Sequence, residues 1–437
     1  MPGDEGLFQG LPVRKDLAEK LVAGIGHIRF GGDMINSLMF DWRTMTQPPD
    51  KRRQYLDGWN YHKSAQFMIF EFLDFCRAAE VEPVINLGEH LPAEEVAAFV
   101  EYCNGDASTA GGRQRIADGH PAAYGLRRIM YGNGLPPIEQ AERLPDLLAK
   151  IDPHVRLILG DIGHTPWFMV SRRDPPRAAG INRFLTRLEA VSSRPEVALL
   201  GSHRLWDTTL DEAQAGFPAL GKTARLYAEE INGSAYNWQR GLCDALIAVT
   251  SQRRGSLVWG HAYCNALQAH GHLYEWNQGH IHFTPSASWY QPSGWVVRML
   301  GEHLLPVAVQ AEASCPRLSV EHVGEHHKNE NVEVPALTVS ASRSRDGQRL
   351  SLNIVNLWGG PVETTVTLGD TTETWKVTGT TISSLHLAGR NTAARPDYIA
   401  PHPITVPSPA AGQLTITLLP MSLTIVSAKI EQPTSGT

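Results

Sequence analysis

Acidic side chains stand near the ends of two predicted strands. Glu229 and Glu230 lie in the run ARLYAEEIN, residues 224–232, and Glu89 directly follows the run EPVINLG, residues 82–88. A carboxylate can attack an electrophilic carbon, and a carboxylic acid can donate a proton to a leaving oxygen. Because side chains alternate along a strand, we expect only one of Glu229 and Glu230 to point toward a shared site. Salt bridges at the rim of a sheet are the alternative interpretation of this pair.

A third strand end carries an amide and no acid. The segment LRRIMYGNG, residues 126–134, predicts a buried strand that is followed by Asn133 between two glycines. Asn133 can bind a ligand, or it can belong to a plain Gly-Asn-Gly turn. Gly134 has no proton to donate, so an acid at this edge must come from a neighbouring loop.

Three carboxyl groups are candidates for that acid. Glu89 is the nearest by topology because it follows the adjacent strand, and Asp161 and Glu139 rank behind it. A carboxylate at the carboxyl end of a barrel strand is often catalytic. The alternative interpretation places Glu89 at the start of the following helix, where a negative charge is favoured by the helix dipole.

These positions depend on an alternation of strands and helices between Val22 and about Pro306. Short runs rich in β-branched residues alternate with amphipathic helices, which predicts βα units around a parallel sheet. The seven strand candidates are 25–30, 82–88, 126–133, 156–162, 197–203, 224–232 and 256–263. A (β/α)8 barrel needs eight strands, so either one escapes the pattern or the chain begins inside the first βα unit.

The sequence changes character past Pro306. Runs such as LTVSASR, LSLNIVNLW and QLTITLL alternate with period two and follow one another at about ten residues, which predicts an antiparallel β-sandwich. We therefore expect an α/β barrel over residues 1–305, an all-β sandwich over residues 306–430 and a disordered tail over residues 431–437.

The composition excludes several classes of protein. The 437 residues carry a formal net charge of -6 with scattered basic residues, so we expect no nucleic-acid partner. No apolar run of the length of a membrane span occurs, and the amino terminus lacks the features of a secretory signal. We expect a cytoplasmic protein with no membrane contact, although a signal peptide can lie upstream of the present start.

Cysteines and histidines are the side chains of this sequence that most often bind transition metals. The five cysteines are widely spaced and form no C-x-x-C pair, so we expect them to be reduced and buried. Histidines are densest in residues 261–283, where the H-x-H spacings fit a zinc site only loosely. We therefore expect neither a metal nor another cofactor.

A series of segments, in order along the chain, resembles the α-L-arabinofuranosidases of glycoside hydrolase family 51, especially the branch shared by plants and some bacteria. The segments are MPGDEG, LPVRKDLAEKL, HIRFGGDM, FDWR, EFLDFCRAAEVEPVINLG, FVEYCNGDAST, RQRIADGHPAAYGLRRIMYGNG, PSASWYQPSGWVVRML, LSLNIVNLWGGPVETTVTL and LTITLLPMSLTIVSAK. The resemblance implies a (β/α)8 barrel followed by a β-sandwich and metal-free retaining hydrolysis of terminal furanosides. Two departures are a missing first barrel strand and Gly134, which replaces the family's proton-donor glutamate.

The resemblance also implies roles for individual residues. Matching EEIN to the family's D-E-W-N pattern makes Glu230 the nucleophile, with Glu229 as second choice. Arg29 resembles the arginine that holds the nucleophile's carboxylate, and Asn133 resembles the asparagine that binds the sugar's 2-hydroxyl. His203 resembles a histidine at the end of the sixth strand near the nucleophile, although a strand-end histidine is often only a satisfied polar group.

The expected partner is a carbohydrate. Trp206, near a strand end, is a candidate for stacking on a sugar face, although most large aromatic side chains belong to the core. We expect a retaining glycosidase that releases terminal α-L-arabinofuranosyl residues in arabinan degradation, with Glu89 as a substitute acid, and we also expect self-association into a homo-oligomer. The alternatives are a catalytically impaired sugar-binding relative, a truncated gene product and a hydrolase of another furanoside.

Overall fold

The computed structural model describes most of the chain. The described residues are 6–32, 40–56, 62–63, 65–160, 175–185, 190–193, 202–233, 235–271, 277–324, 327–368, 374–410 and 412–431. The predicted tail, residues 431–437, lies outside them apart from Glu431.

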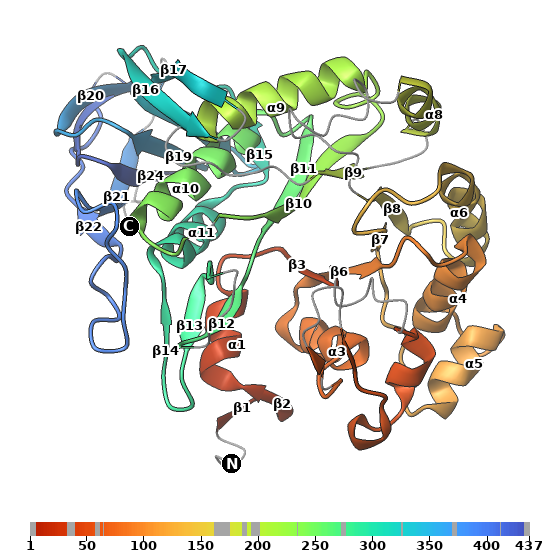
Figure 1. The fold of residues 1–437 in the computed structure, drawn as a ribbon. Helices are drawn as coiled ribbons and strands as arrows, with labels where there is room; N and C mark the ends of the chain where they lie inside the picture. The colour runs from red at the N-terminus through yellow and green to blue at the C-terminus, as the bar shows by residue number, and fades with distance from the viewer. Residues whose placement is uncertain are drawn as a thin grey trace, which may run out of the picture.

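A seven-stranded parallel sheet forms the centre of the amino-terminal part (Figure 1). Its strands are β3 (His27–Phe30), β6 (Glu82–Leu87), β7 (Arg128–Tyr131), β8 (Arg156–Leu159), β9 (Ala190–Ser193), β10 (Arg225–Ile231) and β11 (Val258–Tyr263). They lie in the order β11-β10-β9-β8-β7-β6-β3, so each strand pairs with the next one along the chain. This neighbour-to-neighbour parallel order is that of βα units wound in one direction.

Helices connect these strands and cover the outside of the sheet. They are α1 (Lys15–Val22), α3 (Ile69–Ala79), α4 (Ala93–Asn104), α5 (Ala110–Ala117), α6 (Ile138–Ile151), α8 (Pro175–Leu185), α9 (Ser202–Gly216), α10 (Trp238–Arg253) and α11 (Pro292–His303). Short elements fill the connections: β1 (Leu7–Phe8), β2 (Leu11–Arg14), β4 (Tyr55–Leu56), β5 (His62–Lys63), and the 3-10 helices η2 (Trp42–Thr46) and η3 (Pro49–Lys51).

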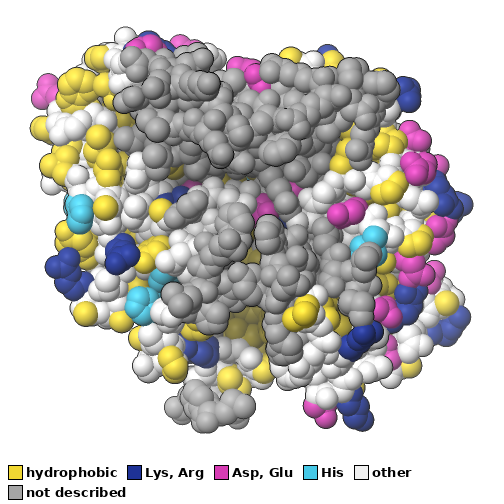
Figure 2. Space-filling view, viewed as in Figure 1, with side chains coloured by type: hydrophobic (Ala, Val, Ile, Leu, Met, Phe, Trp, Pro, Cys, Tyr) yellow, Lys and Arg dark blue, Asp and Glu magenta, His cyan; other side chains and the backbone are white. Residues whose placement is uncertain are grey.

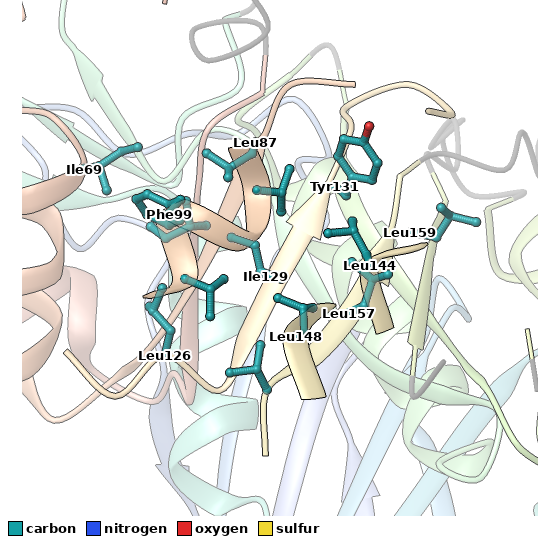
Figure 3. Close-up of a cluster of buried hydrophobic side chains, with 14 of the residues drawn as sticks. Ile69, Leu87, Phe99, Leu126, Ile129, Tyr131, Leu144, Leu148, Leu157 and Leu159 are labelled. Atoms are coloured by element: carbon teal, nitrogen blue, oxygen red, sulfur yellow. The ribbon is translucent and has the colours of Figure 1, made fainter. Parts of the chain in front are cut away.

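The strands are held by an apolar core on their outer side. Figure 3 shows Ile129 and Tyr131 of β7 and Leu157 of β8 packed against Leu144 and Leu148 of α6, all of them buried. The opposite faces of α4, α5 and α6 carry acidic and basic side chains, which gather on the right of Figure 2. The helices are therefore amphipathic in the way that the sequence pattern predicts.

The inner side of the sheet has a core of its own. Val84, Met130, Ile158 and Tyr227, from four different strands, form one buried cluster. Side chains of parallel strands that meet on one face fill the interior of a barrel-like sheet. The sheet is therefore curved with a packed interior.

The two edge strands of this sheet are β3 and β11. The rings of His27 on β3 and Trp259 on β11 lie 5.0 Å apart between their centroids. Both edges line one cavity of about 940 Å³, which also contacts α11 and β15. Among the described residues no strand pairs with both edges, so the structure shows a curved seven-stranded sheet and not a closed barrel.

The carboxy-terminal part is a two-layered β structure. Its larger sheet has the order β15-β18-β19-β24-β21-β22. The strands are β15 (Val307–Val309), β16 (Arg317–Gly324), β17 (His327–Pro335), β18 (Leu337–Arg343), β19 (Arg349–Asn356), β20 (Val362–Thr367), β21 (Trp375–Ser383), β22 (His402–Ile404), β23 (Gln413–Leu418) and β24 (Ser422–Ile430). Val339 and Ile354 of the larger sheet pack against Leu414 and Ile416 of the β20-β23 pair, as in the predicted sandwich.

The two parts share an apolar interface. Leu242 and Val249 of α10 and Val296 of α11 belong to the same buried cluster as Val355 of β19 and Leu423 of β24. Because this cluster joins α10 and α11 to β19 and β24, these two helices pack the amino-terminal part against the sandwich.

One predicted strand is wrong. Residues 197–203 are the fifth strand that the sequence predicts, but β9 covers Ala190–Ser193 and Ser202 already begins α9. The residues of α9 repeat apolar side chains with helical spacing, since Trp206, Leu210 and Ala213 are all buried. This 3.6-residue period determined the structure after residue 201; residues 194–201 lie outside the described part.

A small sheet follows β11 and carries buried histidines. It consists of β12 (Leu267–Ala269), β13 (Ile281–Phe283) and β14 (Ser288–Tyr290). His280 and His282 are 5% and 2% exposed. Burial and the nearby Arg240 guanidinium lower the pKa of His280 to about 3, and burial lowers the pKa of His282 to about 4.

These two histidines predict acid sensitivity. The unfolded chain titrates them near pH 6.5, so below that pH it binds protons that the folded protein does not bind. We expect the free energy of unfolding to fall as pH is lowered from 6.5 toward 4, by about 2 kcal/mol per histidine at about pH 5. Urea unfolding at about pH 7 and pH 5 measures this loss. The double variant His280→Gln/His282→Gln should lose less stability, and an unchanged pH dependence in that variant would contradict the assignment.

Within the described residues, none of the helices is both long enough and apolar enough to cross a bilayer.

Candidate active site

The predicted carboxylates meet the predicted arginine at the carboxyl ends of β10 and β3. Nη2 of Arg29 donates to Oε2 of Glu229 at 3.2 Å, and Nη1 of Arg29 lies 3.7 Å from Oε1 of Glu230. The side chain of Glu229 is fully buried, whereas that of Glu230 is 20% exposed. Of the two carboxylates, Glu230 is therefore the one that a ligand reaches more readily.

The alternation along β10 does not separate the two carboxylates as expected. Their contacts to one guanidinium contradict the expectation that only one of them points toward the site. The pairing of β10 with β11 shifts register between Ala228 and Ile231. An irregularity of this kind turns the strand locally, which accounts for two successive side chains on the same side.

Asn133 completes the cluster from the end of β7. Its Oδ1 accepts hydrogen bonds from Arg29 Nη2 and, at 3.4 Å, from Nδ2 of Asn86 on β6. Asn133 and Asn86 are 2% and 0% exposed. The guanidinium therefore fixes the amide and both carboxylates relative to one another.

Two glycines after Arg29 leave room above this cluster. A Cβ on Gly31 would lie 2.6 Å from Cβ of Asn86, and the φ of Gly31 is +141°, so a larger residue does not fit there. A Cβ on Gly32 would lie 3.7 Å from Oδ1 of Asn133 and 3.8 Å from Oε1 of Glu230. The space over Gly32 thus touches both candidate binding groups.

Glu89 lies next to this cluster, at the end of β6. Its Oε2 accepts the backbone N–H of Asn133 at 3.1 Å and that of Gly134 at 3.4 Å. Helix α4 begins only at Ala93, with Pro92 as its N-cap. The carboxylate therefore contacts the neighbouring strand end and does not cap a helix, which contradicts the alternative interpretation of this residue.

A buried arginine that the sequence reasoning missed holds the end of β10. Arg240 is 3% exposed. It donates to the carbonyls of Ile231 at 2.9 Å and Gly233 at 2.8 Å, and to Asp244 at 2.7 Å. Burial raises the pKa of Asp244 to about 6, against the opposing effect of Arg240. Arg240 and Asp244 are four residues apart in an apolar helix, and this spacing is the sequence signal that could have predicted a buried pair.

Two further side chains at this edge were also missed. Gln278 accepts the N–H of Gly233 at 2.8 Å and donates to Oδ1 of Asn232 at 2.7 Å. Sγ of Cys264, at the end of β11, lies 3.9 Å from Oε1 of Glu230. Neither residue belongs to a recognisable motif, so nothing in the sequence alone pointed to it.

The carboxylates open into the cavity between the edge strands. Its lining includes Arg29, Glu229 and Glu230, together with other residues of β3 and β11. A cavity of about 940 Å³ falls within the size range of small-molecule sites in proteins.

Two predicted binding residues lie on helix α9 and not on a strand. Trp206 is 2% exposed on α9, where its Nε1 donates to Oγ of Ser251 at 2.9 Å, so it is a core residue and not a sugar-stacking surface. His203 lies in the first turn of α9 and not at a strand end. Helical packing of residues 202–216 overrode the strand prediction on which both assignments depended.

The structure also places the residues considered as metal ligands. No group of three or more histidine, cysteine or acidic side chains is arranged around a common point in the described part of the chain. Within the histidine-rich stretch, His270 and His282 contact each other and the Trp289 ring. His272 and Asp161 lie outside the described residues.

Comparison with known families identifies the chain. Residues 22–143 match the model of the alpha-L-arabinofuranosidase 1 domain, and residues 206–422 match that of the alpha-L-arabinofuranosidase C-terminal domain. The chain belongs to glycoside hydrolase family 51, the α-L-arabinofuranosidases. In this family-51 chain, the first match ends beyond Asn133 and the second includes Glu229 and Glu230.

Curated relatives of this family-51 chain are longer proteins. It is 22% identical over 347 residues to the extracellular exo-alpha-L-arabinofuranosidase of Streptomyces chartreusis. The aligned region covers 70% of this chain and 40% of that protein. It is 29% identical over 171 residues to alpha-L-arabinofuranosidase C of Emericella nidulans, covering 35% and 34%. The chain thus spans less than half of the length of these relatives.

Solved structures share the fold. The α-L-arabinofuranosidase of Thermotoga maritima, crystallised with arabinose, superimposes with a TM-score of 0.81 at 18% identity, covering 95% of this chain and 90% of the other. The family-51 enzyme of Thermotoga petrophila gives a TM-score of 0.79 at 19% identity with the same coverage. At these identities the likeness extends to the fold.

Proposed function

We propose that the protein is a retaining glycoside hydrolase that releases terminal α-L-arabinofuranosyl residues from oligosaccharides or polysaccharides. The observation that carries the proposal is Glu230, a partly exposed carboxylate that faces a cavity and contacts a buried guanidinium. The activity of a relative supports the substrate class, since the Streptomyces protein is an extracellular exo-α-L-arabinofuranosidase.

Each residue of the cluster has a role in this reaction. Glu230 attacks the anomeric carbon, and the bond to the leaving oxygen breaks as a glycosyl ester forms. Arg29, whose Nη1 lies 3.7 Å from Oε1 of Glu230, orients the attacking carboxylate. Asn133 is placed to bind a hydroxyl next to the anomeric carbon, a contact that strengthens as positive charge develops on the ring.

Glu229 supports Glu230 and does not replace it. Its side chain is fully buried against Arg29, so it neutralises the guanidinium without reaching the cavity as readily as Glu230 does. The assignment of the nucleophile to Glu230 follows from this difference in exposure.

We also infer that the seven-stranded sheet belongs to a (β/α)8-type barrel, in which the described residues supply no strand between β3 and β11. The strand order, the packed interior and the His27–Trp259 contact across the open edges support this inference. Active sites of such barrels lie at the carboxyl ends of the strands, which is where Arg29, Asn133 and Glu230 lie.

An aryl glycoside assay tests the proposed function. We expect hydrolysis of 4-nitrophenyl α-L-arabinofuranoside, with proton NMR showing that arabinose is first released as the α-anomer. The same assay with 4-nitrophenyl β-D-galactofuranoside and α-L-arabinopyranoside tests substrate choice. Faster cleavage of the galactofuranoside would favour a hydrolase of another furanoside. Calorimetric binding of arabinose without turnover of any glycoside would favour a sugar-binding relative.

A further inference from the structure

Retaining hydrolysis needs a second carboxyl group that donates a proton to the leaving oxygen and later accepts one from water. Gly134 stands where the resemblance places the donor, and it has no side chain. The geometry points to Glu89 as the proton donor of this chain, a catalytic residue supplied by β6 in place of one at the end of β7. This inference rests on the proposed function.

The carboxylate of Glu89 is fixed at the end of β7. The paired strands β6 and β7 run parallel, with Leu87 opposite Tyr131, so the residues that follow them emerge at the same edge. Oε2 of Glu89 accepts both the Asn133 and Gly134 amides. Hydrogen bonds from these two adjacent backbone groups hold the Glu89 carboxylate next to Asn133. The side chain of Asn133 in turn contacts Arg29.

The glycines around Glu89 make room for it. A Cβ on Gly134 would lie 3.4 Å from Oε1 of Glu89 and 3.8 Å from its Cδ. A Cβ on Gly132 would lie 3.2 Å from the Cβ of Glu89. A longer side chain at either position would compete with Glu89 for the same space. The Glu89 carboxyl group therefore lies in contact with the point from which a side chain at position 134 would extend.

The remaining oxygen is available for chemistry. Oε2 accepts both backbone hydrogen bonds, whereas Oε1 faces the space left by Gly134. Glu89 is partly exposed, so solvent reaches its side chain. Asn133, whose backbone holds Glu89, and Glu230 both border the space above Gly32. Glu89 is thus connected to this space through the backbone of Asn133, and Glu230 borders it directly.

The proton transfers balance over the two half-reactions. In the first, the Oε1–H of Glu89 gives its proton to the glycosidic oxygen, which takes the electron pair of the breaking C1–O bond, and Glu230 forms an ester with C1. In the second, water attacks C1, its proton passes to the Glu89 carboxylate, and the ester bond breaks to regenerate the Glu230 carboxylate. The net reaction consumes one water and needs no other reactant.

Leaving-group dependence tests the assignment. We expect Glu89→Ala and Glu89→Gln to lower kcat/KM for phenyl α-L-arabinofuranoside by about 10²- to 10⁴-fold. The loss should be much smaller for the 2,4-dinitrophenyl glycoside, whose leaving group needs little protonation. The basic limb of the kcat/KM pH profile should also disappear. Glu89→Gln retains an oxygen for the two backbone hydrogen bonds, so a loss shared by both variants is not caused by a disordered loop.

Glu139→Gln is the matched control, because Glu139 is an exposed glutamate in the first turn of α6, just after the same strand end. It should keep the parent's leaving-group dependence.

Azide should reactivate Glu89→Ala and give an α-configured glycosyl azide, because it attacks the glycosyl ester in place of water. The assignment of Glu89 alone is wrong if two results occur together. The Glu89 variants would keep the parent's leaving-group dependence and pH profile, and Glu230→Gln would inactivate the protein. A parent protein that hydrolyses no arabinofuranoside would overturn the proposed function with it.

Discussion

Glu230→Gln is expected to lower kcat/KM for 4-nitrophenyl α-L-arabinofuranoside by about 10⁴-fold or more, because the amide cannot form the glycosyl ester. The side chain is 20% exposed and the substitution keeps its shape, so the fold should be retained and its thermal unfolding temperature should change little. Steady-state kinetics together with circular dichroism measures both quantities.

The neighbouring Glu229→Gln variant is the control for this prediction. Glu229 is fully buried against Arg29, so its replacement should reduce stability and leave a much larger share of the activity. Azide adds a second criterion. In a Glu230→Ala variant it should attack the substrate directly and give a β-configured glycosyl azide, opposite to the product expected from Glu89→Ala. A larger loss of activity in Glu229→Gln than in Glu230→Gln would reverse the two assignments.

Arg29→Met is expected to destabilise the protein as well as inactivate it. The guanidinium is 8% exposed and faces the fully buried Glu229. Removing one member of a buried ion pair leaves an uncompensated charge and typically costs about 3–5 kcal/mol. The same substitution releases Asn133 and Glu230, so kcat should fall even at temperatures where the variant stays folded.

Two comparisons make this prediction specific. Arg29→Lys keeps the charge but cannot present the planar fork that contacts Glu229, Glu230 and Asn133, so it should recover stability more than activity. Lys15→Ala breaks an exposed pair with Glu19, in which both side chains are more than half exposed, and should cost less than about 1 kcal/mol. Urea unfolding at neutral pH measures all three variants. An Arg29→Met variant as stable as the parent would contradict the buried-pair geometry.

The strand ends could be predicted from the sequence where the pattern was local. The run EPVINLG predicted β6 within one residue, and the alternation of strands and helices predicted the parallel sheet, because each βα unit has its own period. The strand over residues 197–203 failed for the same reason, since its last residues belong to the helical period of α9.

Contacts between distant strands were less predictable. Arg29, Asn133 and Glu230 were inferred from the family resemblance. The resemblance implies that these three residues lie at one site, although they are far apart in the sequence. The register shift on β10, which brings Glu229 to the same guanidinium, depends on how β10 pairs with β11. It therefore could not be predicted from the two adjacent glutamates in the sequence. Trp206 became a core residue because its helix packs against Ser251 of α10. The contact of Glu89 with the Asn133 and Gly134 amides likewise depends on the pairing of β6 with β7.

Covalent trapping of the nucleophile distinguishes Glu230 from every other carboxylate. The folded protein is incubated with a 2-deoxy-2-fluoro-α-L-arabinofuranoside that carries a dinitrophenyl leaving group, because the fluorine slows hydrolysis of the glycosyl ester. After peptic digestion, mass spectrometry locates the attached sugar. We expect one fluoroarabinosyl group on Glu230, the carboxylate that contacts Arg29 and faces the cavity. A sugar attached to Glu229 or to another residue, or no adduct at all, would contradict it.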